Sequence, residues 1–159
     1  MDFNDWLLAL HLLAAACLVA AIVLFNVLIV ASWKLDVPSA IDRTMGPARW
    51  GNVLVTIGSL GVLLLGIWLA FATDSYAIWD PWILGAIILW AIFAGTGLRS
   101  GKLYTAAGER AHELAVAGND APNPELNAML RSSTALWLNI ASNVAVLLLL
   151  IDMIWKPGA

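Results

Sequence analysis

The chain has 159 residues, of which 62% are apolar and 12% charged, and its mean hydropathy is +0.86. Soluble domains carry about a quarter of their residues as charges, so this composition excludes an ordinary water-facing surface and predicts one that faces lipid. The net charge is −3 without a basic tract, which argues against nucleic acid as a partner, and the single cysteine, Cys17, excludes an internal disulfide.

Four long stretches of the chain contain no charged residue. A helix of about 20 residues crosses the hydrocarbon layer, and only a helix satisfies its own backbone there. Each stretch therefore predicts a transmembrane helix, and we expect an all-α fold, an antiparallel bundle in a single membrane domain spanning 1–159. The expected transmembrane helices cover about 6–33, 50–73, 81–99 and 132–155.

The connections between these helices differ in length. Residues 34–49 have a proline near each end and room for one helical turn between them. Residues 100–117 predict a helical extension of the third span that ends at Gly118. Asn123 is a good N-cap with proline after it, so residues 124–131 predict an extension that continues into the fourth span.

Basic residues are distributed unevenly among the connections. The first and third connections hold seven Lys and Arg, whereas the second holds none and the tails hold only Lys156. Because Lys and Arg accumulate in cytoplasmic loops, we expect a multi-pass protein of the inner (plasma) membrane with both termini outside. Its expected partners are the lipid bilayer itself and either another membrane protein or a second copy of the chain.

Tryptophan and small residues carry weaker signals. Most of the nine tryptophans lie near span ends, where indole prefers the headgroup boundary, while Trp68 and Trp90 lie deeper and are expected to pack between helices. Small residues at close spacing let helix backbones approach. The candidates for such contacts are Ala16, Ala20, Gly58, Gly61, Gly66, Ala91 and Gly95.

His11 is the most notable polar residue of the first span. It lies five residues inside Trp6, within the hydrocarbon, where an ionisable group needs a partner and is a candidate functional residue. Asp152 lies at a similar depth at the end of the fourth span, so we expect the two to pair. The functional interpretations are a haem or metal ligand or a proton relay. The structural alternatives for His11 are a hydrogen bond between two helices or a side chain that reaches the membrane interface, and the alternative for Asp152 is an ion pair with Lys156.

Four asparagines form a second polar group. Asn26 lies in the inner half of the first span, Asn52 in the second, and Asn139 and Asn143 one turn apart in the fourth. Their depths predict that they converge within the bundle. An asparagine in hydrocarbon needs a hydrogen-bonding partner, so the cluster either holds the helices together or lines a polar pocket for a small ligand.

No further motif indicates chemistry. Glu109, His112 and Glu113 have a spacing that suits a metal, but they lie on a charged helix and predict a solvated face, so no metal site is expected. The sequence has no metalloprotease motif, no glycine-rich phosphate loop and no nucleophile with a plausible base.

Three segments carry a resemblance to known proteins: "DWLLALHLLAAACLVAAIVLF", "GVLLLGIWLAF" and the closing "LLLLIDMIWKPGA". They resemble bacterial four-helix membrane proteins of the uncharacterised family called domain of unknown function 2269. More distantly, His11 is similar to the first-helix histidine of copper-resistance D membrane proteins and of J-type protoporphyrinogen oxidases. The latter resemblance implies haem held by that histidine and a helix-three lysine, but Arg99 and Lys102 here lie at the opposite end of their span.

These observations predict a non-enzymatic integral membrane protein with an accessory, structural or partner-binding role and no cofactor. The alternative is a haem- or metal-binding redox protein that uses His11, with Asp152 beside it.

Overall fold

The computed structural model describes residues 3–72 and 77–157, without the side chain of Arg49, and contains six helices in that part of the chain. No strand occurs among these residues, which confirms the all-α prediction. In chain order the helices are α1 (Phe3–Ser32), α2 (Pro38–Met45), α3 (Ala48–Ala72), α4 (Pro81–Val116), α5 (Pro124–Leu130) and α6 (Ser133–Trp155).

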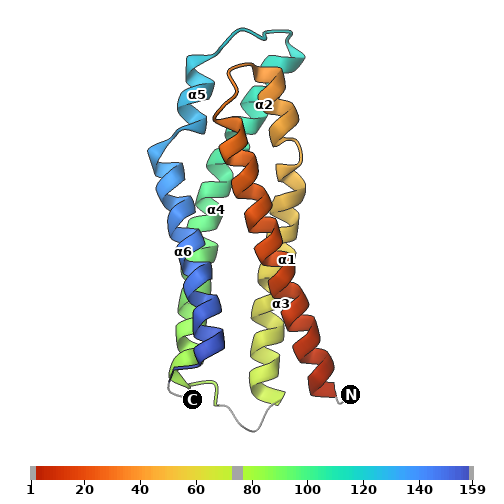
Figure 1. The fold of residues 1–159 in the computed structure, drawn as a ribbon, viewed down its shortest axis with the longest axis vertical. Coiled ribbons are helices and arrows are strands. Elements are labelled where there is room, and N and C mark those ends of the chain that lie inside the picture. The colour runs from red at the N-terminus through yellow and green to blue at the C-terminus, as the bar shows by residue number, and fades with distance from the viewer. Residues whose placement is uncertain (1–2, 73–76, 158–159) are drawn as a thin grey trace.

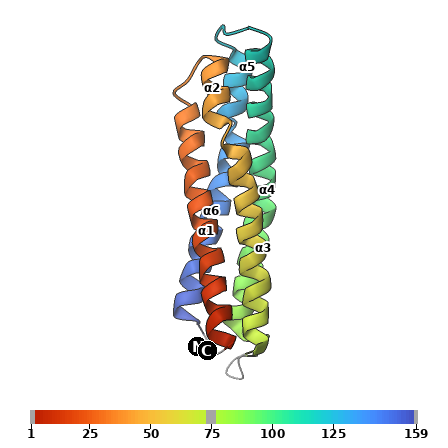
Figure 2. The same cartoon turned by 90° about the vertical axis from the view of Figure 1, so that its right-hand side faces the viewer.

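The four long helices form two antiparallel pairs. Helix α1 packs mainly on α3, and α4 packs mainly on α6, while contacts between the pairs are sparse along the spans. Figures 1 and 2 show the pairs side by side, with both termini at one end and α2 and α5 at the other. We call the first of these the terminal end and the second the distal end.

The outer surface of the bundle is apolar. Four helical segments in the described part of the chain are long and apolar enough to cross a membrane: α1, α2 with α3, α4, and α5 with α6. Large hydrophobic side chains such as Leu13, Ile57, Leu98 and Leu147 are exposed on them, which water would not favour. The prediction of a membrane protein with four spanning helices is therefore supported by both length and surface.

The two tryptophans that lie deeper in the spans, Trp90 and Trp68, differ in burial and in contacts. Trp90 is half-buried, and its indole N–H donates to the carbonyl and hydroxyl oxygens of Ser59 at 3.1 and 3.0 Å. Trp68 is 55% exposed, and its ring meets the ring of Phe3 on α1 with 5.9 Å between their centres, so it contacts the neighbouring helix at the surface of the bundle and is not enclosed between helices.

Close backbone contact occurs where glycine faces a neighbouring helix. A Cβ atom on Gly58 would lie 3.0 Å from the backbone nitrogen of Leu18, and one on Gly61 would lie 3.0 Å from the Cβ of Ala14. These contacts agree with the expectation for α3. The other small residues proposed for this role, Ala16, Ala20, Ala91 and Gly95, are exposed, so that part of the prediction is wrong: spacing alone does not tell which face of a helix meets a neighbour.

The distal end holds the largest buried core. Tyr104 of α4, Ile41 of α2 and Leu126 of α5 are almost completely inaccessible and belong to one cluster. Helix α4 has 36 residues and is thus about 54 Å long, against about 30 Å of hydrocarbon. A helix of this length exceeds the hydrocarbon thickness by about 24 Å. Residues 34–49 contribute a two-turn helix to the distal core, where a single turn was expected.

The ends of the distal helices match their sequence signals. Asn123 caps α5 by accepting a hydrogen bond from the backbone N–H of Leu126 at 3.0 Å. Beyond α4, Gly118 has a φ of +71°, and the N–H of Asn119 donates to the carbonyl of Leu114 at 2.9 Å. This left-handed glycine with its long backward hydrogen bond is a common way to end a helix.

The fourth span departs from the prediction of a helix that runs unbroken from residue 124. The chain breaks at Arg131, and Ser132 begins α6 by accepting a hydrogen bond from Ala135 N–H. The break coincides with two hydrogen bonds to Trp33, the residue that follows α1. The Trp33 indole donates to the carbonyl of Leu130 at 2.9 Å, and the Arg131 guanidinium donates to the carbonyl of Trp33 at 2.8 Å.

Candidate functional site

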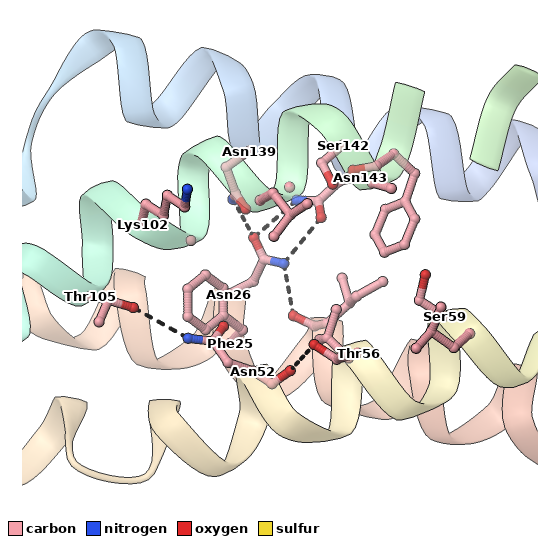
Figure 3. A pocket seen from close by; sticks show the side chains of 18 of the residues that line it. Phe25, Asn26, Asn52, Thr56, Ser59, Lys102, Thr105, Asn139, Ser142 and Asn143 are labelled. Carbon is pink, nitrogen blue, oxygen red and sulfur yellow. Dashed lines mark hydrogen bonds between the residues drawn. The ribbon is translucent and has the colours of Figure 1, made fainter. Parts of the chain in front are cut away.

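An asparagine cluster joins the two helix pairs in the middle of the bundle. The carboxamide oxygen of Asn26 on α1 accepts hydrogen bonds from Asn139 at 2.8 Å and from Asn143 at 3.0 Å, both on α6. The amide nitrogen of Asn26 donates to the carbonyl of Ile22 at 2.8 Å and to Asn143 at 3.3 Å. Figure 3 shows the Asn26 side chain reaching across to α6.

The fourth predicted asparagine lies on a different wall of the same region. Asn52 of α3 donates to the hydroxyl of Thr105 on α4 at 3.2 Å, and its backbone carbonyl accepts from Thr56. Asn52 makes no hydrogen bond with Asn26, Asn139 or Asn143 in the described residues. The structure thus brings three asparagines into direct contact and places the fourth across a space from them (Figure 3).

That space is a cavity of about 590 Å³ between the helix pairs, which we call the central cavity. Its volume lies within the range of about 300–1,000 Å³ typical of ligand sites. Residues of α1, α3, α4 and α6 line it, so it exists because the pairs meet only in part along the spans. Amide and hydroxyl groups form one part of its wall, and apolar side chains such as Val55, Leu60 and Phe93 form the rest.

Two charged residues line the central cavity on the distal side. Lys102 and Glu109 lie on α4, two turns apart on one face of the helix, and neither makes an ion pair with any residue that the structure describes. Figure 3 shows the Lys102 side chain on α4 among the residues that line the cavity. The sequence did not single out Lys102 as a site residue, and the spacing of Glu109 with His112 and Glu113 predicted only a solvated face, although Gly101, Thr105 and Glu109 recur at helical spacing on the cavity face of α4.

His11 lines a second, smaller cavity near the terminal end. The imidazole is 9% exposed and its Nδ1 atom makes no hydrogen bond with the described residues. The ring lies against α3, where a Cβ on Gly66 would come within 3.0 Å of its Cε1 atom. This cavity, which we call the terminal cavity, has a volume of about 240 Å³ and mostly apolar walls.

The expected pairing of His11 with Asp152 does not occur. Both the Nδ1 atom of His11 and the Oδ2 atom of Asp152 are buried without a hydrogen-bonding partner among the described residues. Asp152 lies against α4, where its Oδ1 atom would be 3.4 Å from a Cβ on Gly85. The two residues belong to different helix pairs and each packs on its own pair, which equal depth along the helices could not show.

The spacing of Glu109, His112 and Glu113 does not assemble a metal site. The His112 Nδ1 atom lies 3.2 Å from both carboxylate oxygens of Asp42 on α2, and Glu113 pairs with Arg110 at 2.9 Å. No group of three His, Cys, Asp or Glu in the described part of the chain is arranged to hold a metal ion. Glu109 instead lines the central cavity.

Comparison of the chain with protein-family models, with curated proteins and with solved structures finds no match. The resemblance to the uncharacterised four-helix family and to haem-binding membrane proteins therefore stays a prediction. The geometry of the two cavities is the observation on which a function can be argued.

Proposed function

We propose that the chain is a non-enzymatic integral membrane protein that binds an amphipathic ligand in the central cavity. The observation that carries the proposal is the combination of a lipid-facing exterior with an interior space of about 590 Å³ whose wall is part polar and part apolar. The space is open at its sides, because lining residues such as Leu60, Leu98 and Lys102 are exposed, so a lipid could reach it from the surrounding bilayer.

The polar part of the ligand is defined by Lys102 and Glu109. These side chains have opposite charges, line the same cavity and lack ion-pair partners in the described residues. They are separated by about 10 Å along the axis of α4. A head group with a positive and a negative charge, such as that of a zwitterionic phospholipid, could pair with both, whereas a purely anionic head would meet repulsion from Glu109.

The apolar part of the ligand is defined by the deeper wall. Phe93, Leu60 and Val55 line the cavity on α3 and α4, the two helices between which contact is sparse. An acyl chain can lie against such a surface without unsatisfied polar groups. The proposal therefore names a zwitterionic lipid as ligand, with its head toward the distal end and its tail between the pairs.

Mass spectrometry of the protein released intact from a mild detergent tests this proposal. We expect one lipid to stay bound after delipidation that strips peripheral lipids, and the double variant Lys102→Met, Glu109→Gln to lose it. Arg99→Met is the matched control, because Arg99 is exposed on the same helix and does not line the cavity. Equal lipid retention in the wild type and the double variant, or no retained lipid in the wild type, would contradict the proposal.

The rival proposal, a haem redox protein that uses His11, has weaker support. The cavity beside His11 has a volume of about 240 Å³, below the range of about 300–1,000 Å³ for drug-sized ligands, which disfavours a porphyrin there. An absorption band in the Soret region that disappears in His11→Ala would support the haem proposal.

We further propose that the protein resides in the plasma membrane with the distal end in the cytoplasm and both termini outside. Lys34, Arg43, Lys102 and Arg131 belong to the distal half, whereas Lys156 is at the terminal end, and basic residues favour the cytoplasmic side. Reporter fusions at Ala77 should report an outside location and fusions at Gly118 an inside one. The reverse pattern would contradict this orientation.

A further inference from the structure

The terminal and central cavities lie end to end along one face of α4. The residues of α4 that line the terminal cavity continue at helical spacing into those that line the central cavity, and the lining residues of α3 do the same. On α4 the shared face runs at four-residue spacing through Ala86, Trp90, Ala94, Leu98 and Lys102. The two spaces are therefore parts of one groove, and the head group of the proposed lipid lies in its distal part.

Trp90 divides this groove. Among the residues that the structure describes, Trp90 alone lines both cavities. Its two hydrogen bonds to Ser59 hold the indole against α3, across the seam where α3 and α4 otherwise make sparse contact. The ring also packs on an apolar cluster that includes Leu18 of α1 and Val146 of α6, so all four long helices contribute to this level. Trp90 is thus the member of this layer that separates the two cavities.

The terminal cavity, beyond Trp90, is suited to hydrocarbon. Apart from His11 and Lys156, the residues that line it are apolar. Both of these polar residues interact within the chain. His11 shares a hydrogen bond with the backbone of Val62, and the Lys156 ammonium lies 5.4 Å from the centre of the Trp82 ring. The end of an acyl chain can therefore enter this space without breaking a hydrogen bond.

The position of Trp90 matches the reach of an ordinary lipid tail. Trp90 lies about 18 Å from Lys102 along the axis of α4. The hydrocarbon layer is about 30 Å thick, so the acyl chains of one leaflet fill about 15 Å of it. A tail of that length, with its head group at Lys102, ends close to Trp90. A longer tail must displace the indole from Ser59 or bend out between α3 and α4 into the bilayer.

We propose that Trp90 determines the length of the acyl chain that the groove accepts. The inference rests on the lipid proposed for the central cavity and adds a selectivity for its tail, while Lys102 and Glu109 select its head. Chains that end at Trp90 fit the central cavity, and longer chains are disfavoured because the indole closes the way to the terminal cavity. Removing the indole joins the two spaces and admits longer chains.

Mass spectrometry of the intact protein, equilibrated in mild detergent with an equimolar mixture of phosphatidylcholines that differ only in acyl-chain length, tests the proposal. We expect the wild type to retain the longest chains about tenfold less than the best-retained ones, because extra methylenes must be forced into a packed space. Trp90→Ala should abolish this discrimination. Trp137→Ala is the matched control and should keep it, because Trp137 is 68% exposed on α6 and lines neither cavity.

Further variants separate an effect on chain length from a loss of stability. Trp90→Phe keeps a large ring but lacks the indole N–H, so it should keep the length limit, and loss of the limit in this variant would contradict closure by the ring. Trp90→Leu is a smaller change that should shift retention toward longer chains even if Trp90→Ala fails to fold. Ala86 is buried and lines the terminal cavity, so adding Ala86→Leu to Trp90→Leu should reverse the shift.

The outcomes distinguish this inference from the function on which it rests. Lipid that the wild type retains without regard to chain length, or with the same length limit as Trp90→Leu, would overturn the role of Trp90 and leave the proposed function intact. A wild type that retains no phosphatidylcholine would overturn both.

Discussion

Asn26 and Asn139 are joined by a hydrogen bond of 2.8 Å that connects α1 to α6, two helices from different pairs. Asn143 completes the contact, so the amide of Asn26 makes three hydrogen bonds to α6. Contacts between the pairs are otherwise sparse along the spans. The cluster therefore holds the pairs at the separation that leaves the central cavity open.

Replacing Asn26 with leucine should lower the free energy of unfolding by about 1–3 kcal/mol, because each interhelical bond in a membrane contributes about 0.5–2 kcal/mol and the two partners on α6 lose an acceptor. Unfolding in mixed detergent micelles, followed by circular dichroism, measures the change. Val27→Ala, at an exposed neighbouring position, serves as the control. If the two asparagines interact as described, the effects of Asn26→Leu and Asn139→Leu will be less than additive in the double variant.

Gly58→Ala should destabilise the protein by about 1–3 kcal/mol, because the added Cβ would lie 3.0 Å from the backbone of Leu18 and backbone cannot yield. Gly95→Ala should be neutral or slightly stabilising, since nothing lies within 4 Å of its Cβ position and alanine favours the helix. Thermal unfolding of the two variants in the same detergent compares them. Equal melting temperatures would show that α1 and α3 do not pack through this glycine.

Ile41→Ala should lower the free energy of unfolding by about 2–5 kcal/mol, the cost of a large-to-small change in a packed core. Ile41 is completely buried on α2, within the distal core. Limited proteolysis of residues 34–49 should become faster as well. Leu98→Ala is the matched control, because Leu98 is 65% exposed, and a loss of stability as large as that of Ile41→Ala would argue against a packed distal core.

Cys17 should resist a charged maleimide in intact membranes. It is exposed on α1, about 21 Å along the helix from Phe3, and its thiol therefore faces hydrocarbon, which a charged maleimide does not enter. A cysteine introduced at exposed Asn119 at the distal end, in a Cys17→Ser background, should react in opened membranes. Both should react in SDS. Rapid reaction of Cys17 before denaturation would mean that this face of α1 meets water.

Part of the candidate site could be predicted from the sequence. Depth along the spans predicts that Asn26 and Asn139 share a level, and the structure brings them together. Depth does not specify rotation about the helix axis, so the same argument wrongly pairs His11 with Asp152. The rotation of α1 instead directs His11 to α3, because Gly66 leaves room there for the imidazole. Lys102 was missed because a basic residue near a span end is ordinarily a surface residue.

The sequence by itself determined that this chain is helical and spans a membrane four times, because uncharged stretches of that length are stable only as helices in hydrocarbon. Only the tertiary structure decided that the helices associate as two pairs, that residues 34–49 pack into a distal core, and that two cavities lie between the pairs. The reason is that lipid satisfies an apolar helix face as well as a neighbouring helix does. Hydrophobicity therefore determines that the helices lie in lipid, while the positions of glycine and asparagine determine which helices pack against each other.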